Sequence, residues 1–136
     1  MSKKVTRVIY PEKIPSGTSQ QRKLAIINGK ATSYPSKTLT ETRRIYASAL
    51  KLAEMPLEPL GNACRISVSF MYETKDKRKL RGVYKSTKPD LDNLLKPFLD
   101  SLVKFNYLND DSIIVQISAN KKWSEKTMIL FEIEEV

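Results

Sequence analysis

Two acidic pairs in the C-terminal half of the sequence are the residues best suited to chemistry. Asp90 and Asp92 lie on either side of Leu91, and Asp110 and Asp111 follow after one predicted helix. Carboxylate oxygens are the ligands that hard cations such as Mg²⁺, Mn²⁺ and Ca²⁺ prefer. Three or four carboxylates that converged would therefore bind such a cation, which can activate water for hydrolysis. The spacing alone does not show which end of the predicted helix Asp111 approaches.

Other residue types that could build a catalytic site are missing from the chain. The sequence contains no histidine, and Cys64 is its only cysteine. These two facts exclude disulfides within the chain, zinc sites built from histidine or cysteine, and catalytic dyads that use an imidazole. A catalytic metal would thus be bound by oxygen ligands.

Two prolines limit where the helix that follows the first acidic pair can begin. Pro89 disfavours a helical conformation at the residue before it, and a proline in a helix interior is disruptive. Either the helix begins directly after Pro89 and is kinked at Pro97, or it begins near Asn93. In the second arrangement the segment with Asp90 and Asp92 is extended, and both carboxylates project to one side. Without a metal, the two carboxylates would simply complement the positive end of the helix dipole.

Basic residues are concentrated before the acidic pairs. The chain has 136 residues and a formal net charge of +9. Residues 1–89 contain 19 Lys and Arg against 6 Asp and Glu, a charge of +13, whereas residues 90–136 contain 5 against 9, a charge of −4. The excess is greatest between Thr74 and Pro89, where seven bases accompany one acid, Asp76. The seven bases are Lys75, Lys77, Arg78, Lys79, Arg81, Lys85 and Lys88.

This basic segment predicts contacts with the phosphates of a nucleic acid. A run of bases is often only a solvated loop, and that interpretation stays open for the segment taken alone. A membrane-surface role is disfavoured, because no apolar helical face accompanies the bases. The sequence also lacks the apolar run of a signal peptide and any apolar stretch of membrane-spanning length, so we expect a cytoplasmic protein that does not contact membranes.

Hydropathy patterns predict a single α+β domain over residues 1–136, with two main helices packed on a small mixed β-sheet. The expected element order is β-β-β-α-β-α-β-β. The predicted strands are Val5–Tyr10, Leu24–Asn28, Ala31–Tyr34, Cys64–Tyr72, Ser112–Ala119 and Thr127–Glu134, and the predicted helices are Thr38–Leu52 and an apolar helix between Leu91 and Leu102. A loop that contains Trp123 is expected between the last two strands.

Two segments of this sequence resemble the signature blocks of RusA-type Holliday junction resolvases. The segments are Lys88-Pro89-Asp90-Leu91-Asp92-Asn93-Leu94-Leu95-Lys96 and Leu108-Asn109-Asp110-Asp111-Ser112-Ile113-Ile114-Val115. In that family a basic residue precedes an Asp-Leu-Asp-Asn-Leu-x-Lys block, an apolar helix follows, and a Leu-x-Asp-Asp block opens a strand. The order of the other predicted elements agrees with the family over most of the chain.

The resemblance implies a homodimeric, RusA-like endonuclease domain that uses Mg²⁺ or Mn²⁺ to make paired cuts in four-way DNA junctions during recombination and repair. It implies that Asp90, Asp92 and Asp111 are the catalytic metal ligands and that Lys96 is an essential basic residue. Asp110 is implied as a neighbouring acid and a further candidate ligand. No small-molecule cofactor is expected, and many members of the family are encoded by phages or prophages.

Two interpretations of function are therefore compared. The first is a metal-dependent endodeoxyribonuclease selective for branched DNA, and the second is a non-catalytic, basic nucleic-acid-binding module in which the acids cap helices and turns. The acidic spacing favours the first, because a pure binder gains nothing from carboxylates beside its phosphate site. Lys96 contacts the substrate phosphate in the first interpretation, whereas in the second it forms an ordinary ion pair with Asp92 or Asp100.

Overall fold

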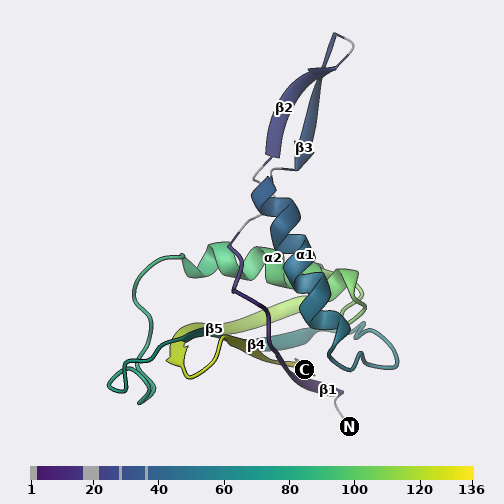
Figure 1. The fold of residues 1–136 in the computed structure, drawn as a ribbon. Coiled ribbons are helices and arrows are strands. Elements are labelled where there is room, and N and C mark those ends of the chain that lie inside the picture. Colours follow the sequence, from purple (N-terminus) through teal and green to yellow (C-terminus); the bar gives the residue numbers. More distant parts are fainter. Residues whose placement is uncertain (1–2, 17–21, 28, 36) are drawn as a thin grey trace.

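Residues 3–16, 22–27, 29–35 and 37–136 are described by the computed structural model of the chain (Figure 1). The predicted element order is confirmed, with one short 3₁₀ helix, η1, in addition. The elements are β1 (Lys4–Ile9), β2 (Arg22–Ile27), β3 (Lys30–Pro35), α1 (Lys37–Lys51), β4 (Cys64–Glu73), α2 (Leu91–Lys104), η1 (Asp111–Ile113), β5 (Ile114–Ser124) and β6 (Met128–Glu135). The fold class is α+β, as the sequence predicts.

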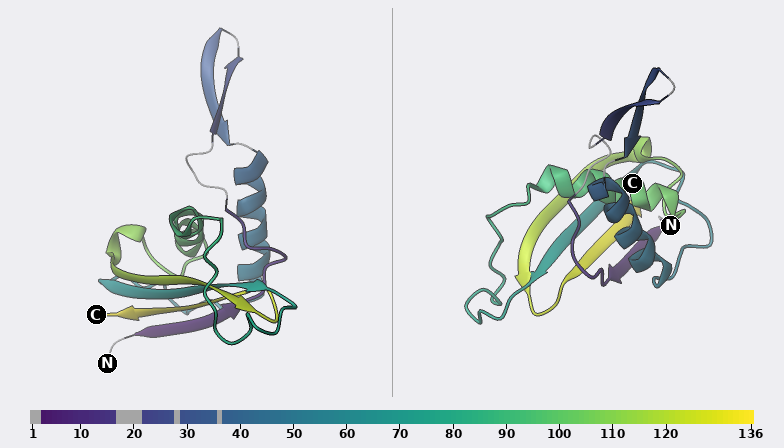
Figure 2. Two further views of the ribbon diagram at one scale, coloured as in Figure 1. Left: turned by 90° about the vertical axis from the view of Figure 1, so that its left-hand side faces the viewer. Right: turned by 45° about the horizontal axis from the view of Figure 1, so that its top comes forward.

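The main sheet has four strands in the order β1-β6-β4-β5 and is mixed, as expected. β6 pairs antiparallel with β1 and β4, whereas β4 and β5 run parallel to each other. Neighbouring parallel strands need a crossover connection, and α2 is the helix of that crossover. α2 therefore crosses one face of the sheet, and α1 lies on the same side (Figure 2).

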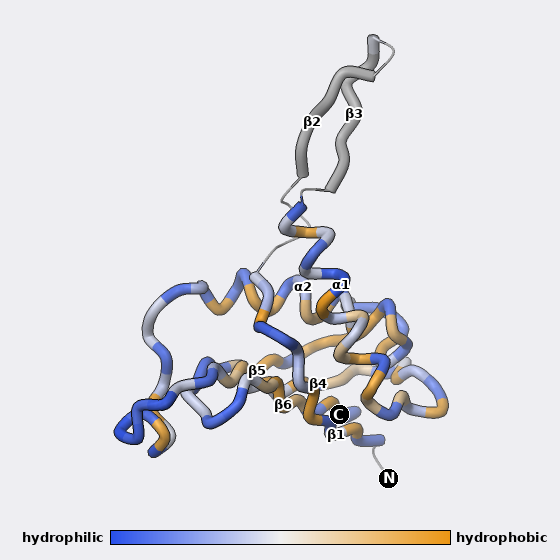
Figure 3. Tube along the Cα trace, in the orientation of Figure 1, coloured by the Kyte–Doolittle hydropathy of each residue, from blue (hydrophilic) through white to orange (hydrophobic). Residues whose placement is uncertain are grey.

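An aromatic cluster holds α2 on the sheet. Phe98 is completely buried, and its ring centre lies 5.8 Å from that of Tyr46 on α1, 5.8 Å from that of Phe70 on β4 and 5.3 Å from that of Phe131 on β6. Leu94 and Leu102, each about one turn from Phe98, are also completely buried. Figure 3 shows the same concentration of apolar residues along the strands and α2. The apolar stripe of α2 thus fixes which face of the helix is left to solvent.

The structure decides between the two helix starts that the prolines allow. α2 begins at Leu91 and continues through Pro97 to Lys104, so a start near Asn93 is wrong. Asp90 alone is extended, with φ −69° and ψ 143°, and Asp92 lies in the first helical turn. An interior proline costs a helix about 3 kcal/mol, which burial of the Leu94, Phe98 and Leu102 side chains offsets.

β5 differs from its prediction at both ends. The predicted start at Ser112 lies within η1, and the strand continues to Ser124, so that Trp123 belongs to the strand and not to a loop. The reason is the length of its neighbour: β4 pairs with β5 from Cys64 opposite Ile114 to Glu73 opposite Ser124. Hydrogen bonds to β4 therefore extend β5 beyond Ala119, where the loss of apolar alternation had predicted its end.

The other short elements agree with expectation. β2 and β3 form a separate antiparallel hairpin that projects away from the sheet (Figures 1 and 2). Gly29 in its turn has a φ of 78°, a conformation that glycine adopts without strain. Among the helices that the structure describes, none has both the length and the apolar composition needed to cross a membrane.

The core position of α2 gives the first prediction. Leu102→Ala lowers the free energy of unfolding by about 2–5 kcal/mol, because the completely buried side chain leaves a cavity between α2 and the sheet. Leu52→Ala is the matched control: its side chain is 92 % exposed, and a change of no more than about 0.5 kcal/mol is expected. Urea denaturation followed by circular dichroism measures both. Equal losses in the two variants would contradict the packing described here.

Candidate active site

Lys96 links Asp111 of the second acidic pair to α2, the helix that begins at the first pair. Its ammonium lies 3.1 Å from Oδ1 of Asp100, one turn further along α2, and 3.5 Å from Oδ2 of Asp111 on η1. The hydrogen bond from Lys96 to Asp100 and the charge of that carboxylate raise the pKa of Lys96, and Asp111 adds to the effect. Lys96 is therefore positively charged, and its ion pair with Asp111 attaches η1 to α2.

The place where Asp111 meets α2 follows from the topology. Since β4 and β5 are parallel, the crossover helix α2 runs back across the sheet toward the start of β5. η1 directly precedes β5, so Asp111 meets α2 beside Lys96 and Asp100. This contact answers the question that the spacing left open.

Asp90 and Asp92 lie at the N-terminal end of the same helix. Asp90 is the residue before the first turn, where its main-chain oxygen accepts a hydrogen bond from the Leu94 N–H at 3.3 Å. Its carboxylate makes no capping hydrogen bond, and both Asp90 and Asp92 are exposed. A side chain that served only to cap the helix would bond to the free N–H groups of that turn. Asp90 is instead open to another ligand.

Asp110 and Asp111 are adjacent in sequence but have different surroundings. The Asp110 carboxylate accepts hydrogen bonds from the Ser112 hydroxyl and from the Ser112 N–H, at 3.3 Å for the latter, and so caps η1. The hydroxyl bond is the main reason that the pKa of Asp110 is lowered. Asp111 has Lys96 as its ion-pair partner. The capping role thus belongs to Asp110, and Asp111 faces α2.

The acids do not form a closed ligand set in this structure. Within residues 3–16, 22–27, 29–35 and 37–136, no three His, Cys, Asp or Glu residues are grouped closely enough to hold a metal ion. Three carboxylates held together without a cation repel one another, and Lys96 supplies a positive charge to Asp111 instead. The carboxylate oxygens suit a hard cation, and in this structure the ammonium of Lys96 balances the charge of Asp111.

The basic segment forms the loop between β4 and α2, which is mostly hydrophilic (Figure 3). Five of its seven predicted phosphate-binding bases are exposed: Lys75, Lys77, Arg78, Arg81 and Lys88. The Lys79 ammonium lies 4.5 Å from the ring centre of Trp123 and is half-buried. This loop leads directly into Asp90, so the exposed bases and the carboxylates belong to one continuous stretch of surface chain.

Lys85 differs from the other predicted phosphate contacts, because its side chain is buried, and its burial does not favour a phosphate contact. Only 9 % of the residue is exposed, and its ammonium donates hydrogen bonds to Thr87 Oγ1 at 2.6 Å and to the main-chain oxygens of Thr87 and Lys88. Burial lowers the pKa of Lys85, and the positive charges of Lys121 and Lys79 lower it further. The inward direction of this side chain depends on how the loop pairs with β5, which a count of bases does not reveal.

Two residues near the site lacked a decisive signal in the sequence. Asp100 was one of two candidate partners for Lys96 at helical spacing, and the structure selects it. Lys121 on β5 donates hydrogen bonds to the main-chain oxygens of Thr87 and Pro89 at 2.7 and 2.8 Å. Because its acceptors belong to the main chain, no pattern of side chains could have identified this contact.

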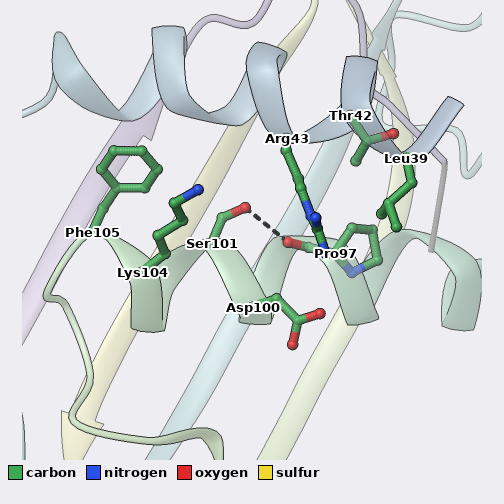
Figure 4. Close-up of a pocket in the computed structure, with 8 residues that line it drawn as sticks. All are labelled: Leu39, Thr42, Arg43, Pro97, Asp100, Ser101, Lys104 and Phe105. Atoms are coloured by element: carbon green, nitrogen blue, oxygen red, sulfur yellow. Dashed lines mark hydrogen bonds between the residues drawn. The ribbon is translucent and has the colours of Figure 1, made fainter. Parts of the chain in front are cut away.

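The cavity between α1 and α2 is separate from the two acidic segments (Figure 4). Its lining residues are Leu39, Thr42, Arg43, Pro97, Asp100, Ser101, Lys104 and Phe105. Asp100 is its one link to the site, since the cavity contains neither acidic pair. Asp90 and Asp92 lie on an open surface instead, an arrangement accessible to a large substrate such as a DNA helix.

Comparison with known proteins identifies related chains. The protein-family model described as Endodeoxyribonuclease RusA matches residues 14–134. The crossover junction endodeoxyribonuclease rusA of Lactococcus phage r1t is 34 % identical over 125 residues, which cover 92 % of this chain and 93 % of the phage protein. The family match includes the basic loop, both acidic segments and Lys96.

The different roles of the adjacent acids give the second prediction. Asp110→Ala lowers the midpoint of thermal unfolding more than Asp111→Ala does, because it removes the acceptor of the Ser112 N–H and hydroxyl at η1. Asp111→Ala removes only a solvent-exposed ion pair, which contributes little to stability. Calorimetry on both variants in metal-free buffer makes the comparison. A larger loss in Asp111→Ala would contradict the assignment of the cap to Asp110.

Proposed function

Because the chain belongs to the RusA family of endodeoxyribonucleases, we propose that it cleaves four-way DNA junctions by hydrolysis of phosphodiester bonds. The observation that carries the proposal is the 3.5 Å contact between Lys96 and Asp111. It joins the second acidic segment to the helix that begins with the first. A basic loop and the first acidic pair precede α2, and Asp111 contacts the same helix through Lys96, so that groups suited to metal-assisted phosphodiester hydrolysis are connected through α2.

The proposed cofactor is a divalent cation, Mg²⁺ or Mn²⁺, with Asp90, Asp92 and Asp111 as its ligands. Two observations support two of these acids: Asp90 makes no capping hydrogen bond, and Asp111 contacts an ammonium that a cation can replace. Asp110 is left out of the ligand set, because its carboxylate caps η1. When bound, such a cation activates water and offsets the negative charge that develops on the phosphate.

Lys96 has two tasks in the proposed mechanism. In the free protein its ammonium compensates the charge of Asp111. Once Asp111 has a cation as its partner, Lys96 can donate hydrogen bonds to an oxygen of the substrate phosphate. In the metal-free protein the carboxylate of Asp100 raises the pKa of Lys96 through a hydrogen bond and its charge. Lys96 therefore acts through charge and hydrogen bonds.

The loop between β4 and α2 is the proposed DNA-binding surface. The proposed phosphate contacts are Lys75, Lys77, Arg78, Lys79, Arg81 and Lys88. Bases that contact phosphates provide affinity without reading sequence and make that affinity depend on salt. Since the loop ends at Asp90, a backbone held by these bases passes close to the carboxylates.

A homodimer is part of the proposal. Paired cuts in the two opposed strands of a junction require two active sites, and two copies related by a two-fold axis supply them with matching geometry. The open location of Asp90 and Asp92 is compatible with two such sites on one branched substrate.

Asp92→Asn is the test of the catalytic assignment. The variant removes one carboxylate charge from the proposed ligand set. Loss of a residue that only supports a metal ligand lowers activity by about 10–100-fold, so cleavage of a synthetic four-way junction in Mg²⁺ should fall by more than that. Junction binding in metal-free buffer should persist or tighten, because one repulsive charge is gone. Gel assays of cleavage and binding measure both.

Glu58→Gln is the matched control for this test, since Glu58 is exposed and its ion pair within the described residues is with Lys3 at 4.0 Å. It should cleave as the natural protein does. Undiminished cleavage by Asp92→Asn would refute the site. If the natural protein binds junctions but cleaves none with Mg²⁺ or Mn²⁺, the non-catalytic binding module is the correct interpretation.

The proposed DNA-binding surface gives a separate prediction. Lys77→Gln removes one phosphate contact, so the slope of log affinity against log salt concentration should decrease by about one in magnitude. Lys51→Gln removes an exposed base from the last turn of α1, outside the loop, and should leave the slope unchanged. Fluorescence anisotropy with a labelled junction in EDTA provides the slopes. Identical slopes in the two variants would show that the loop does not hold the backbone.

A further inference from the structure

Two ammonium groups bind the main chain directly before the first acidic pair. Lys121 donates to the Thr87 oxygen at 2.7 Å and to the Pro89 oxygen at 2.8 Å. Lys85 donates to the Thr87 oxygen at 3.3 Å and to the Lys88 oxygen. All three consecutive carbonyl oxygens from Thr87 to Pro89 therefore accept hydrogen bonds from these two side chains, and the next residue is Asp90.

Both lysines are anchored to the same part of the sheet. Lys121 lies in β5, and the Lys85 N–H donates to the Lys121 oxygen at 2.9 Å. The Trp123 N–H donates to the Val83 oxygen at 3.1 Å, and Tyr84 forms an isolated antiparallel bridge with Lys122, so residues 83–85 are hydrogen-bonded to β5. The carbonyl groups before Asp90 are thus tied to the sheet itself, although they belong to a long loop.

The Lys85 ammonium also has an aromatic environment. It lies 5.0 Å from the ring centre of Tyr72 and 5.3 Å from that of Trp123, and these two rings meet edge to face. Within the described part of the chain, neither Lys85 nor Lys121 forms an ion pair with a carboxylate. Burying an ammonium without a counter-ion is unfavourable, so its hydrogen bonds to the carbonyl groups and the rings must hold it.

From this arrangement we infer that Lys85 and Lys121 are positioning residues, which together clamp residues 87–89 and thereby set where Asp90 and Asp92 stand for the cation. The inference rests on the proposed function, because it assigns the two lysines to the same metal site. Asp90 is held from its other side by the hydrogen bond of its own carbonyl oxygen to the Leu94 N–H at 3.3 Å. The clamp holds Asp90 from the N-terminal side, through residues 87–89.

The clamp acts separately from the core that stabilises α2. Phe98 and Leu102 hold the helix on the sheet through buried contacts further along, so loss of the clamp leaves the helix in place. Loss of the clamp instead makes residues 87–89, which lead into α2, more mobile. Ligands that are not held in position bind a cation more weakly, as happens when partners behind metal ligands are removed.

The test compares Lys121→Met with Lys122→Met. Both variants remove one positive charge from neighbouring positions of β5, but the Lys122 ammonium lies over the ring of Tyr84 at 5.6 Å and takes no part in the clamp. Mn²⁺ binding to the DNA-free protein, measured by electron paramagnetic resonance, should weaken by about 10–100-fold in Lys121→Met and stay unchanged in Lys122→Met. Lys121→Arg retains donors and should restore most of the affinity.

Cleavage kinetics separate positioning from DNA binding. Lys121→Met should lower kcat at saturating junction, whereas its affinity for the junction in EDTA should match that of Lys122→Met. A weaker EDTA affinity together with unchanged Mn²⁺ binding would overturn the inference and make Lys121 a phosphate contact. Equal Mn²⁺ affinity and equal kcat in the two Met variants would overturn it as well.

A second pair keeps the inference testable if Lys121→Met does not fold. Thr87→Val removes only the hydroxyl that Lys85 contacts at 2.6 Å and should weaken Mn²⁺ binding, whereas Ser86→Ala, at the exposed neighbouring position, should not. Equal Mn²⁺ affinity in these two variants would again overturn the clamp. If the natural protein itself neither binds Mn²⁺ nor cleaves junctions, the proposed function has failed, and that outcome is distinct from failure of the clamp alone.

Discussion

The parallel pairing of β4 with β5 is the constraint on which the candidate site depends. Two adjacent parallel strands cannot be joined by a tight turn, so the chain between them must cross the sheet, and α2 is that crossing. Asp90 and Asp92, at the start of this helix, and Asp111, directly before β5, are therefore placed relative to one another by a single rigid element. Lys96 lies on this helix, and its ammonium is 3.5 Å from the carboxylate of Asp111. The geometry of the site is therefore a consequence of sheet topology.

Features of the fold that depend on burial or on a local turn were predictable from the sequence, whereas the full extent of β5, which depends on pairing with β4, was not. The apolar repeat of α2 predicted the helix, because completely buried residues such as Leu94 and Phe98 recur at its period. The local rule for Pro97 left the helix start open, and only the packing of that same stripe decided it. β5 was predicted too short, since Asn120, Lys121 and Lys122 give no apolar alternation. Hydrogen bonds to β4 extend the strand through them.

The candidate site shows the same division. The acidic segments and Lys96 could be identified from residue type and spacing, but Asp110 and Asp111 are adjacent and chemically identical. The family resemblance assigns them different roles, and in the structure Ser112 donates to the carboxylate of Asp110 whereas Asp111 contacts Lys96. Lys85 was counted with the exposed bases of its loop because charge is visible in a sequence and side-chain direction is not. It points inward because residues 83–85 pair with β5, a contact between segments far apart in the chain.

The ion pair between Lys96 and Asp111 also explains how an acidic site can work within a basic protein. On the proposed function, a divalent cation and Lys96 compete for the same carboxylate, and the ammonium displaced by the cation is the one offered to the phosphate. A phosphate that binds Lys96 would draw the ammonium away from Asp111 and so make Asp111 easier for the cation to bind. On this proposal, the cation and the phosphate therefore each favour binding of the other. Such coupling is reciprocal by thermodynamic necessity. On this proposal Lys96 compensates Asp111 in the metal-free protein and would offer its charge to the substrate phosphate once a cation is bound to Asp111.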